Sequence, residues 1–214
     1  MLEADREMRQ AIVKLVIMGT FLAVEGPKGA GKSTLVTALR QRLAGELAGH
    51  VVLTKEPTPG FDLGQETHLL GADLARAIAQ DRAQHVASVI QPALNSGKNV
   101  VCDRYILSSL VFHSADGVPP QEIWRLNQQF PLPDGNLILT AVAEVISGRR
   151  SRRASLTRLE TGSDPAAELD MYLQFGQEMQ ERGVALKIVS HETPEQLEQA
   201  IGWIMHSIRY GISA

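Results

Sequence analysis

One short run of residues constrains the fold more than any other part of the chain. The apolar stretch Phe21–Val24 leads into the pattern Gly26-x-x-x-x-Gly31-Lys32-Ser33, and a helix-favouring stretch follows at once. This is the full phosphate-binding loop pattern, in the strand–loop–helix context that it requires. Small residues let the backbone curl so that successive N–H groups point at phosphate oxygens, and the following helix adds the positive end of its dipole. The sequence therefore predicts a site for a nucleoside triphosphate.

Within this loop, Lys32 is expected to reach the β- and γ-phosphates, and the Ser33 hydroxyl is expected to bind Mg²⁺. The alternative is a glycine-rich turn with a chance lysine, but strand, loop and helix are all in register here. We therefore expect the whole loop to contact ATP, with Mg²⁺ as the cofactor. The predicted ATP-binding residues of the loop are Gly26, Pro27, Lys28, Gly29, Ala30, Gly31, Lys32, Ser33 and Thr34.

The rest of the chain alternates short apolar strands with amphipathic helices, which is typical of a parallel α/β sheet. Strands are expected near 18–25, 51–54, 99–103, 136–141 and 185–189, and helices at about 32–48, 73–96, 105–114, 120–129, 143–153, 165–182 and 194–209. The pattern predicts a three-layer P-loop NTPase fold, with a five-stranded parallel sheet flanked by helices. Residues 18–214 form the single predicted domain, and residues 1–17 read as an N-terminal extension that is either an accessory helix or dispensable for the fold.

Composition narrows the classes of partner. At 214 residues and 44% hydrophobic, the chain can bury a sizeable core as one domain. Its net charge of −3 gives no global basic field, so we expect no nucleic-acid partner. The single cysteine, Cys102, excludes an intramolecular disulfide and is expected to be a buried small hydrophobe. With no apolar span of transmembrane length and no evident cleavable signal, the expected location is cytoplasmic, away from the membrane.

Polar residues follow the predicted strands where ligands bind in open α/β sheets, outside the carboxyl ends. Asp103 ends the run Val100–Cys102, where a carboxylate can hold Mg²⁺, although it could also cap the following helix. Arg104 has a fork of donors suited to phosphate, and a surface ion pair is the alternative. Ser33 and Asp103 are the predicted metal ligands.

Arginines cluster at 149, 150, 152, 153 and 158, after the fourth strand. A nucleic-acid patch and a solvated charge run are the plain alternatives. The phosphate loop favours a third reading, a mobile lid at about 147–160 whose arginines close over the triphosphate and neutralise charge that develops during transfer. Arg149 is assigned to ATP, and Arg153, with Lys32 and Arg104, to catalysis.

Other chemistries have little support in the sequence. His85 and His113 are expected to be helix-face or packed histidines, because no His, Cys or Asp spacing resembles a zinc site. Neither G-x-S-x-G nor H-E-x-x-H occurs, so the sequence gives no support for hydrolases of those kinds.

From Thr20 to about Val189 the chain resembles the thymidylate kinases, P-loop enzymes that move a phosphoryl group from ATP to dTMP. Four blocks carry the resemblance: Phe21–Gly26 into the phosphate loop, Val52–Pro57, Asp81–His85 with Ile90–Leu94, and Asp103–Tyr105 with Ser108–Leu110. The last two are specific to this family, whereas a phosphate loop alone is not.

The resemblance implies a role for each matching residue. Arg82 and Arg104 match arginines that hold the acceptor monophosphate, and Asp103 matches a Mg²⁺-associated aspartate. Arg153 and Arg158 fall where bacterial-type lids place arginines, and the resemblance also suggests a homodimer through helices of the 73–129 region. The residues placed at the acceptor are Glu25, Lys55, Glu56, Pro57, Ile78, Arg82, Arg104, Ser108, Phe112 and His113.

Departures from the family pattern gather at the positions that read the nucleoside. Lys28 replaces an acid in the phosphate loop, Ile78 replaces an aromatic that stacks on thymine, and Thr140 replaces an aspartate. Thr58-Pro59 stands for a Gly-Gly pair and Phe112-His113 for a Tyr-Gln pair. A missing stack removes roughly 1–3 kcal/mol of recognition. dTMP is the default acceptor; a modified pyrimidine nucleotide, another small phosphate acceptor, or a non-catalytic nucleotide-binding role are the alternatives.

Overall fold

The computed structural model describes residues 19–45, 47–152 and 164–212. Its sheet has five strands, all parallel, in the order β2-β3-β1-β4-β5. The predicted five-stranded parallel sheet is confirmed, and each strand lies where the apolar runs predict it. The strands are β1 (Phe21–Glu25), β2 (Val51–Lys55), β3 (Asn99–Asp103), β4 (Gly135–Thr140) and β5 (Ala185–Ser190).

Helices occupy every predicted interval between the strands. The long predicted helix at 73–96 is a continuous stack of α3 (Gly71–His85), the π-helical segment η2 (Val86–Ile90) and α4 (Gln91–Asn95). The 3-10 segment η1 (Leu63–Thr67) precedes it. The remaining helices are α2 (Lys32–Leu43), α5 (Ile106–Ala115), α6 (Pro120–Asn127), α7 (Ala143–Ser151), α9 (Pro165–Glu181) and α10 (Pro194–Tyr210).

Helix α10 begins where its local sequence predicts. Pro194 is the first residue of the helix, and the side chains and backbones of Thr193 and Gln196 satisfy each other in a capping box. Such a cap satisfies N–H groups that the first helical turn otherwise leaves without partners. This start is confirmed.

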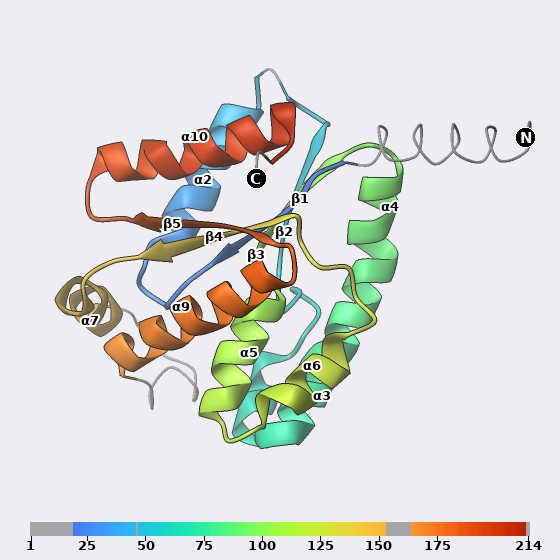
Figure 1. Ribbon diagram of the computed structural model, residues 1–214, viewed down its shortest axis with the longest axis vertical. Coiled ribbons are helices and arrows are strands. Elements are labelled where there is room, and N and C mark those ends of the chain that lie inside the picture. The colour runs from blue at the N-terminus through green and yellow to red at the C-terminus, as the bar shows by residue number, and fades with distance from the viewer. Residues whose placement is uncertain (1–18, 46, 153–163, 213–214) are drawn as a thin grey trace, which may run out of the picture.

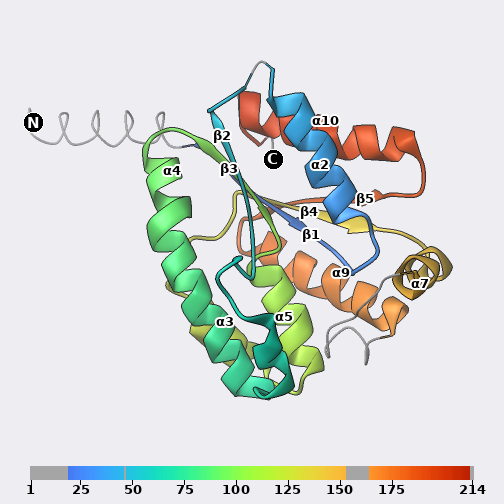
Figure 2. The ribbon, with the colours of Figure 1, turned by 180° about the vertical axis from the view of Figure 1, so that it is seen from behind.

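The molecule has three layers, with helices on both faces of the sheet. Helices α2 and α10 cover one face, and α3, α4, α5, α6 and α9 cover the other (Figures 1 and 2). Successive residues of β1 feed opposite faces, as strand geometry requires: Phe21 and Ala23 join the core cluster under α5 and α9, whereas Leu22 and Val24 join the cluster under α2 and α10. Cys102 is buried in the first of these clusters, as expected.

The parallel register brings the strand ends to one edge. Val24 of β1 is level with Asp103 of β3, and Lys55 of β2 is level with the same residue. The phosphate loop, the residues after β2 and the residues after β3 therefore meet at the carboxyl edge of the sheet. Helix α7 lies at this edge as well (Figure 1). The predicted extension at 1–17, and the lid beyond residue 152, lie outside the described residues.

No helix in the described ranges is both long and apolar enough to cross a membrane.

Candidate active site

The phosphate loop links β1 to α2 and is packed against two neighbouring strands. Gly26 has a φ of 128°, and a Cβ built on it would lie 2.1 Å from the carbonyl oxygen of Leu139. Gly31 has a φ of 104°, and its Cβ would lie 1.9 Å from Nδ1 of His191. Both positions require glycine on conformational and steric grounds. The loop is thus held between the ends of β4 and β5, in the curled form that a phosphate cradle requires.

Lys32, at the first turn of α2, is buried beneath the loop. Its Nζ donates hydrogen bonds to the carbonyl oxygens of Gly26 at 2.7 Å and Pro27 at 2.9 Å. Burial, with the nearby charge of Arg104, lowers the pKa of Lys32 to about 7. Ser33 and Thr34 follow it on the same turn and are exposed. The loop residues predicted to bind ATP therefore form one continuous structure with the predicted catalytic lysine at its centre.

Asp103 ends β3 beside this loop. Its Oδ1 is buried and has no hydrogen-bond partner among the described residues. A buried carboxylate oxygen without a donor is costly, and a hard cation would satisfy it. The exposed hydroxyl of Ser33 supplies a second oxygen on the loop side. These oxygen donors fit Mg²⁺, which would hold the phosphates of ATP and neutralise their charge when bound.

Arg104 adopts a left-handed backbone conformation, with a φ of 71°. A positive φ is uncommon for a residue with a side chain and marks a position that the surroundings enforce. Its Nη1 lies 3.3 Å from the Gly26 carbonyl oxygen, 3.2 Å from Ser108 Oγ and 2.8 Å from the Tyr172 hydroxyl. The guanidinium carbon also lies 5.0 Å from the ring centroid of Phe112. The arginine is therefore fixed next to the phosphate loop.

A cavity of about 280 Å³ opens beside Arg104. Nine of the ten residues that the sequence assigned to the acceptor line it, namely Lys55, Glu56, Pro57, Ile78, Arg82, Arg104, Ser108, Phe112 and His113. Lys28 and Asp103 reach the same cavity from the phosphate-loop side. Leu63, Glu66, Leu74, Tyr105 and Ser109 complete its wall. Tyr105 and Ser109 fall within blocks that carry the family resemblance, whereas the other three lie outside every motif of the sequence. The structure thus brings together residues from β2, α3, β3 and α5 that are distant in the sequence.

Glu25 is the exception. It is fully buried, lies behind the cavity wall, and accepts hydrogen bonds from the Tyr105 N–H at 2.8 Å and from the Ser108 hydroxyl. Burial raises the pKa of Glu25, while the hydrogen bond from Ser108 and the charge of Arg104 oppose that rise. Glu25 is not among the residues that line the cavity, and its role at the acceptor stays a prediction. The side chain caps the start of α5 and orients Ser108, which does line the cavity.

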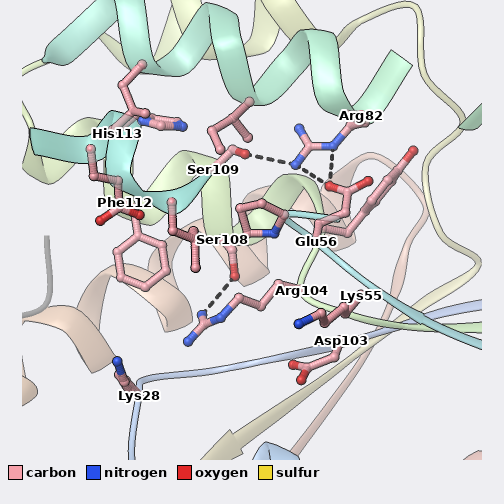
Figure 3. Close-up of a pocket in the computed structure, with 16 residues that line it drawn as sticks. Lys28, Lys55, Glu56, Arg82, Asp103, Arg104, Ser108, Ser109, Phe112 and His113 are labelled. Atoms are coloured by element: carbon pink, nitrogen blue, oxygen red, sulfur yellow. Dashed lines mark hydrogen bonds and ion pairs between the residues drawn. The ribbon is translucent and has the colours of Figure 1, made fainter. Parts of the chain in front are cut away.

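Arg82 lies at the end of the cavity away from the phosphate loop. In Figure 3, Lys28 and Asp103 are on one side of the view, and Arg82 and Ser109 are on the other. Arg82 is 1% exposed, and its guanidinium donates to Glu56 at 2.7 Å, to Ser109 Oγ at 3.0 Å and to the Asn127 side chain. The family resemblance placed Arg82 and Arg104 on one phosphate. In the structure Arg104 lies beside the phosphate loop, whereas Arg82 lies at the other end of the cavity.

His85 is packed behind this arginine. Its Nδ1 lies 2.9 Å from Glu56 and its Nε2 lies 2.6 Å from the Thr54 hydroxyl. With Cys102 these residues could offer three metal ligands. Glu56 is already paired with Arg82, so the group reads as a hydrogen-bonded network. His85 is thus the packed histidine that the sequence predicted, and His113 is buried as well.

Helix α7 contacts the other side of the phosphate loop. Arg149 donates to the carbonyl oxygens of Gly29 at 3.1 Å and His191 at 3.0 Å, so its predicted place beside ATP is consistent with the fold. Arg150 donates to the Lys28 carbonyl oxygen at 2.9 Å and pairs with Glu168 of α9. The arginine cluster in the sequence predicted no separate role for Arg150. Arg153 and Arg158 lie outside the described residues, so their lid roles stay predictions.

These features define a P-loop protein. Its phosphate loop and Asp103 form a triphosphate site, and the cavity between Arg104 and Arg82 forms a second binding site beside it. The family model described as thymidylate kinase matches residues 24–201. The chain belongs to the thymidylate kinase family.

Individual relatives agree with this assignment. A thymidylate kinase of Limosilactobacillus fermentum is 32% identical over 160 residues, covering 66% of this chain and 73% of that protein. One from Exiguobacterium sibiricum is 34% identical and covers 68% and 74%, and one from Xanthomonas oryzae pv. oryzae is 41% identical over 128 residues, covering 56% of each chain. A crystal structure of thymidylate kinase from Ehrlichia chaffeensis superposes with a TM-score of 0.63 at 18% identity, over 89% of this chain and 98% of that one. That likeness supports the P-loop fold.

Proposed function

We propose that this protein transfers the γ-phosphoryl group of ATP to dTMP and forms dTDP and ADP. Membership of the thymidylate kinase family supports the reaction. The single structural observation that carries it is the position of Arg104. This side chain lines the acceptor cavity and at the same time lies 3.3 Å from the Gly26 carbonyl oxygen of the phosphate loop. An acceptor phosphate held by Arg104 would face the γ-phosphate of ATP, as transfer requires.

The residues present account for the reaction without a strong general base. An oxygen of the acceptor phosphate is already an anion; it attacks the γ-phosphorus while the bond to the β–γ bridging oxygen breaks, and ADP leaves. Charge spreads over the transferred group in this step, so catalysis is mostly positioning and electrostatic stabilisation. Lys32 on the ATP side and Arg104 on the acceptor side supply the opposing charge.

Arg104 and Arg82 lie at opposite ends of the cavity, which supports a different role for each arginine. Arg104 suits the phosphate of the acceptor. Arg82, at the other end, suits the base, because its guanidinium is already held by Glu56 and Ser109 and is oriented before any ligand binds. We therefore place the acceptor with its phosphate beside Arg104, toward the loop, and its base toward Arg82.

A second acceptor is favoured by one observation. Lys28 and Ile78, the departures from the family pattern, both line the cavity. A kinase for a modified pyrimidine nucleotide is therefore the second candidate. The involvement of Mg²⁺, a homodimer and a cytoplasmic location stay predictions.

The direct test is product analysis with γ-labelled ATP, dTMP and Mg²⁺. We expect label to appear in dTDP in a one-to-one ratio with ADP, and Lys32→Ala to lower kcat by 10²–10³-fold or more, on the order of the loss of one transition-state donor. Release of ADP without labelled dTDP would refute dTMP as the acceptor. Unchanged turnover in Lys32→Ala would refute the phosphate-loop mechanism.

A further inference from the structure

Helix α9 carries two buried polar side chains on one face. Glu168 is 1% exposed and Tyr172 is fully buried. Residues four apart on a helix lie one above the other on the same side. Burying a carboxylate and a hydroxyl is costly unless each has a hydrogen-bond or ion-pair partner. The partners of Glu168 and Tyr172 therefore indicate the role of this face of α9. Neither side chain is among the residues that line the acceptor cavity.

Tyr172 is partnered with the arginine of the acceptor side. Its hydroxyl accepts a hydrogen bond from Arg104 Nη1 at 2.8 Å and lies 3.0 Å from Ser108 Oγ. The ring of Tyr172 packs edge-on against Phe112, over which the Arg104 guanidinium is stacked. The tyrosine therefore holds the same nitrogen of Arg104 that contacts the Gly26 carbonyl oxygen of the phosphate loop.

Glu168 is partnered with an arginine of the ATP side. Its carboxylate pairs with Arg150, whose Nε donates to the Lys28 carbonyl oxygen at 2.9 Å. Helix α7 lies directly against the loop here, because a Cβ on Gly29 would be 3.1 Å from the carbonyl oxygen of Ile146. Arg150 is only 6% exposed. Arg150 therefore holds the backbone of the phosphate loop at Lys28, and Glu168 holds Arg150 in this position.

We propose that Glu168 and Tyr172 are positioning residues, through which α9 holds the arginines on both sides of the phosphate loop. Tyr172 sets Arg104 for the acceptor phosphate, and Glu168 sets Arg150 against the loop that cradles ATP. The assignment of Arg104 to the acceptor and of the loop beside Arg150 to ATP rests on the proposed function. One helix face thus supports both substrate sites, but through two separate contacts.

Separate contacts predict separate kinetic effects. Tyr172→Phe removes one hydroxyl and keeps the ring, so Arg104 loses a hydrogen bond while the core stays filled. We expect the KM for dTMP to rise about 10-fold, the size of one lost hydrogen bond to a charged group, with the KM for ATP within about twofold of wild type. Glu168→Gln should give the opposite pattern, with about a 10-fold rise in the KM for ATP and little change for dTMP.

Two controls separate positioning from a general loss of stability. Phe175→Leu alters the buried core of the same helix away from both arginines, and should lower the melting temperature without changing either KM. Tyr210→Phe removes a tyrosine hydroxyl from an exposed site and should change nothing. If Glu168→Gln does not fold, the comparison of Tyr172→Phe with Phe175→Leu still decides the question.

The proposal is overturned if Tyr172→Phe raises both KM values equally, or if Phe175→Leu reproduces the effects of either variant. Calorimetry with ATP alone keeps this test apart from the choice of acceptor. Glu168→Gln should weaken ATP binding about 10-fold without any acceptor present, and Tyr172→Phe should leave it unchanged. Should wild-type protein bind ATP but use no monophosphate, the proposed function fails while this measurement still tests Glu168.

Discussion

At the scale of single residues, Lys32 is buried, although it must be positively charged to bind the phosphates of ATP. Its pKa in the free protein is lowered to about 7 by burial and by Arg104. Bound triphosphate favours the charged form and raises that pKa. At pH values above about 7, ATP binding should therefore take up a proton, and affinity should fall as the pH rises. Titration calorimetry at pH 8 in two buffers with different ionisation enthalpies measures this uptake directly.

The matched control for this measurement is Lys32→Arg, because a guanidinium stays charged throughout the range. Its apparent binding enthalpy should be the same in both buffers. Equal enthalpies in wild-type protein at pH 8 would show that ATP binding takes up no proton, which contradicts the predicted charging of Lys32.

Ile78 offers a second prediction at this scale, because it lines the cavity together with Phe112. Replacing it with Phe provides a ring on which a pyrimidine can stack, worth roughly 1–3 kcal/mol. Ile78→Phe should lower the KM for dTMP by about 10-fold. Ile78→Leu keeps an aliphatic side chain and serves as the control. A raised KM in the Phe variant, with Leu unchanged, would mean that the cavity has no room for a second ring beside the base.

At the scale of elements, the junction between the phosphate loop and α2 is the most tightly constrained. Gly31→Ala would force a Cβ to within 1.9 Å of His191 Nδ1, at a φ of 104°. We expect this variant to lose ATP binding and to be destabilised by more than 1 kcal/mol, measured by denaturant unfolding and calorimetry.

Gly202→Ala is the matched control, because it lies inside α10 and its Cβ would meet no atom within 4 Å. Removing a helical glycine at such a site should stabilise the protein by about 0.5–1 kcal/mol and leave ATP binding unchanged. Comparable losses of ATP binding in both variants would contradict the steric argument at Gly31.

The elements themselves could be predicted from sequence because their signals are local. Apolar runs marked all five strands, and the Thr193–Gln196 cap marked the start of α10. The pairings that build the site have no such signal. Glu168 is 18 residues from Arg150, and Asn127 is 45 residues from Arg82. Only the packing of separate helices brings these side chains together. No local sequence pattern therefore predicts a role for Tyr172, Glu168 or Asn127.

At the scale of the whole molecule, the sheet order explains why two substrate sites adjoin. β1 lies between β3 and β4, so the phosphate loop leaves the centre of the sheet. The acceptor cavity is built on the β2 and β3 side, and α7 reaches the loop from the β4 and β5 side. Helices α3 and α5, which lie over one face of the sheet (Figure 1), supply side chains that line the cavity. The motifs predicted that candidate residues gather at this edge of the sheet, but they gave no sign that Glu25 is buried against Ser108.

The central claim, phosphoryl transfer from ATP to a monophosphate held between Arg104 and Arg82, is tested most directly by one experiment. Steady-state ADP release would be measured with Mg·ATP against dTMP, dUMP and the other nucleoside monophosphates. The account predicts turnover with dTMP and a kcat/KM at least about 10-fold above that for dUMP, since one methyl group in a fitted pocket contributes that much. Tight ATP binding without turnover on any acceptor would contradict it, and selective turnover of another monophosphate would move the function to that acceptor.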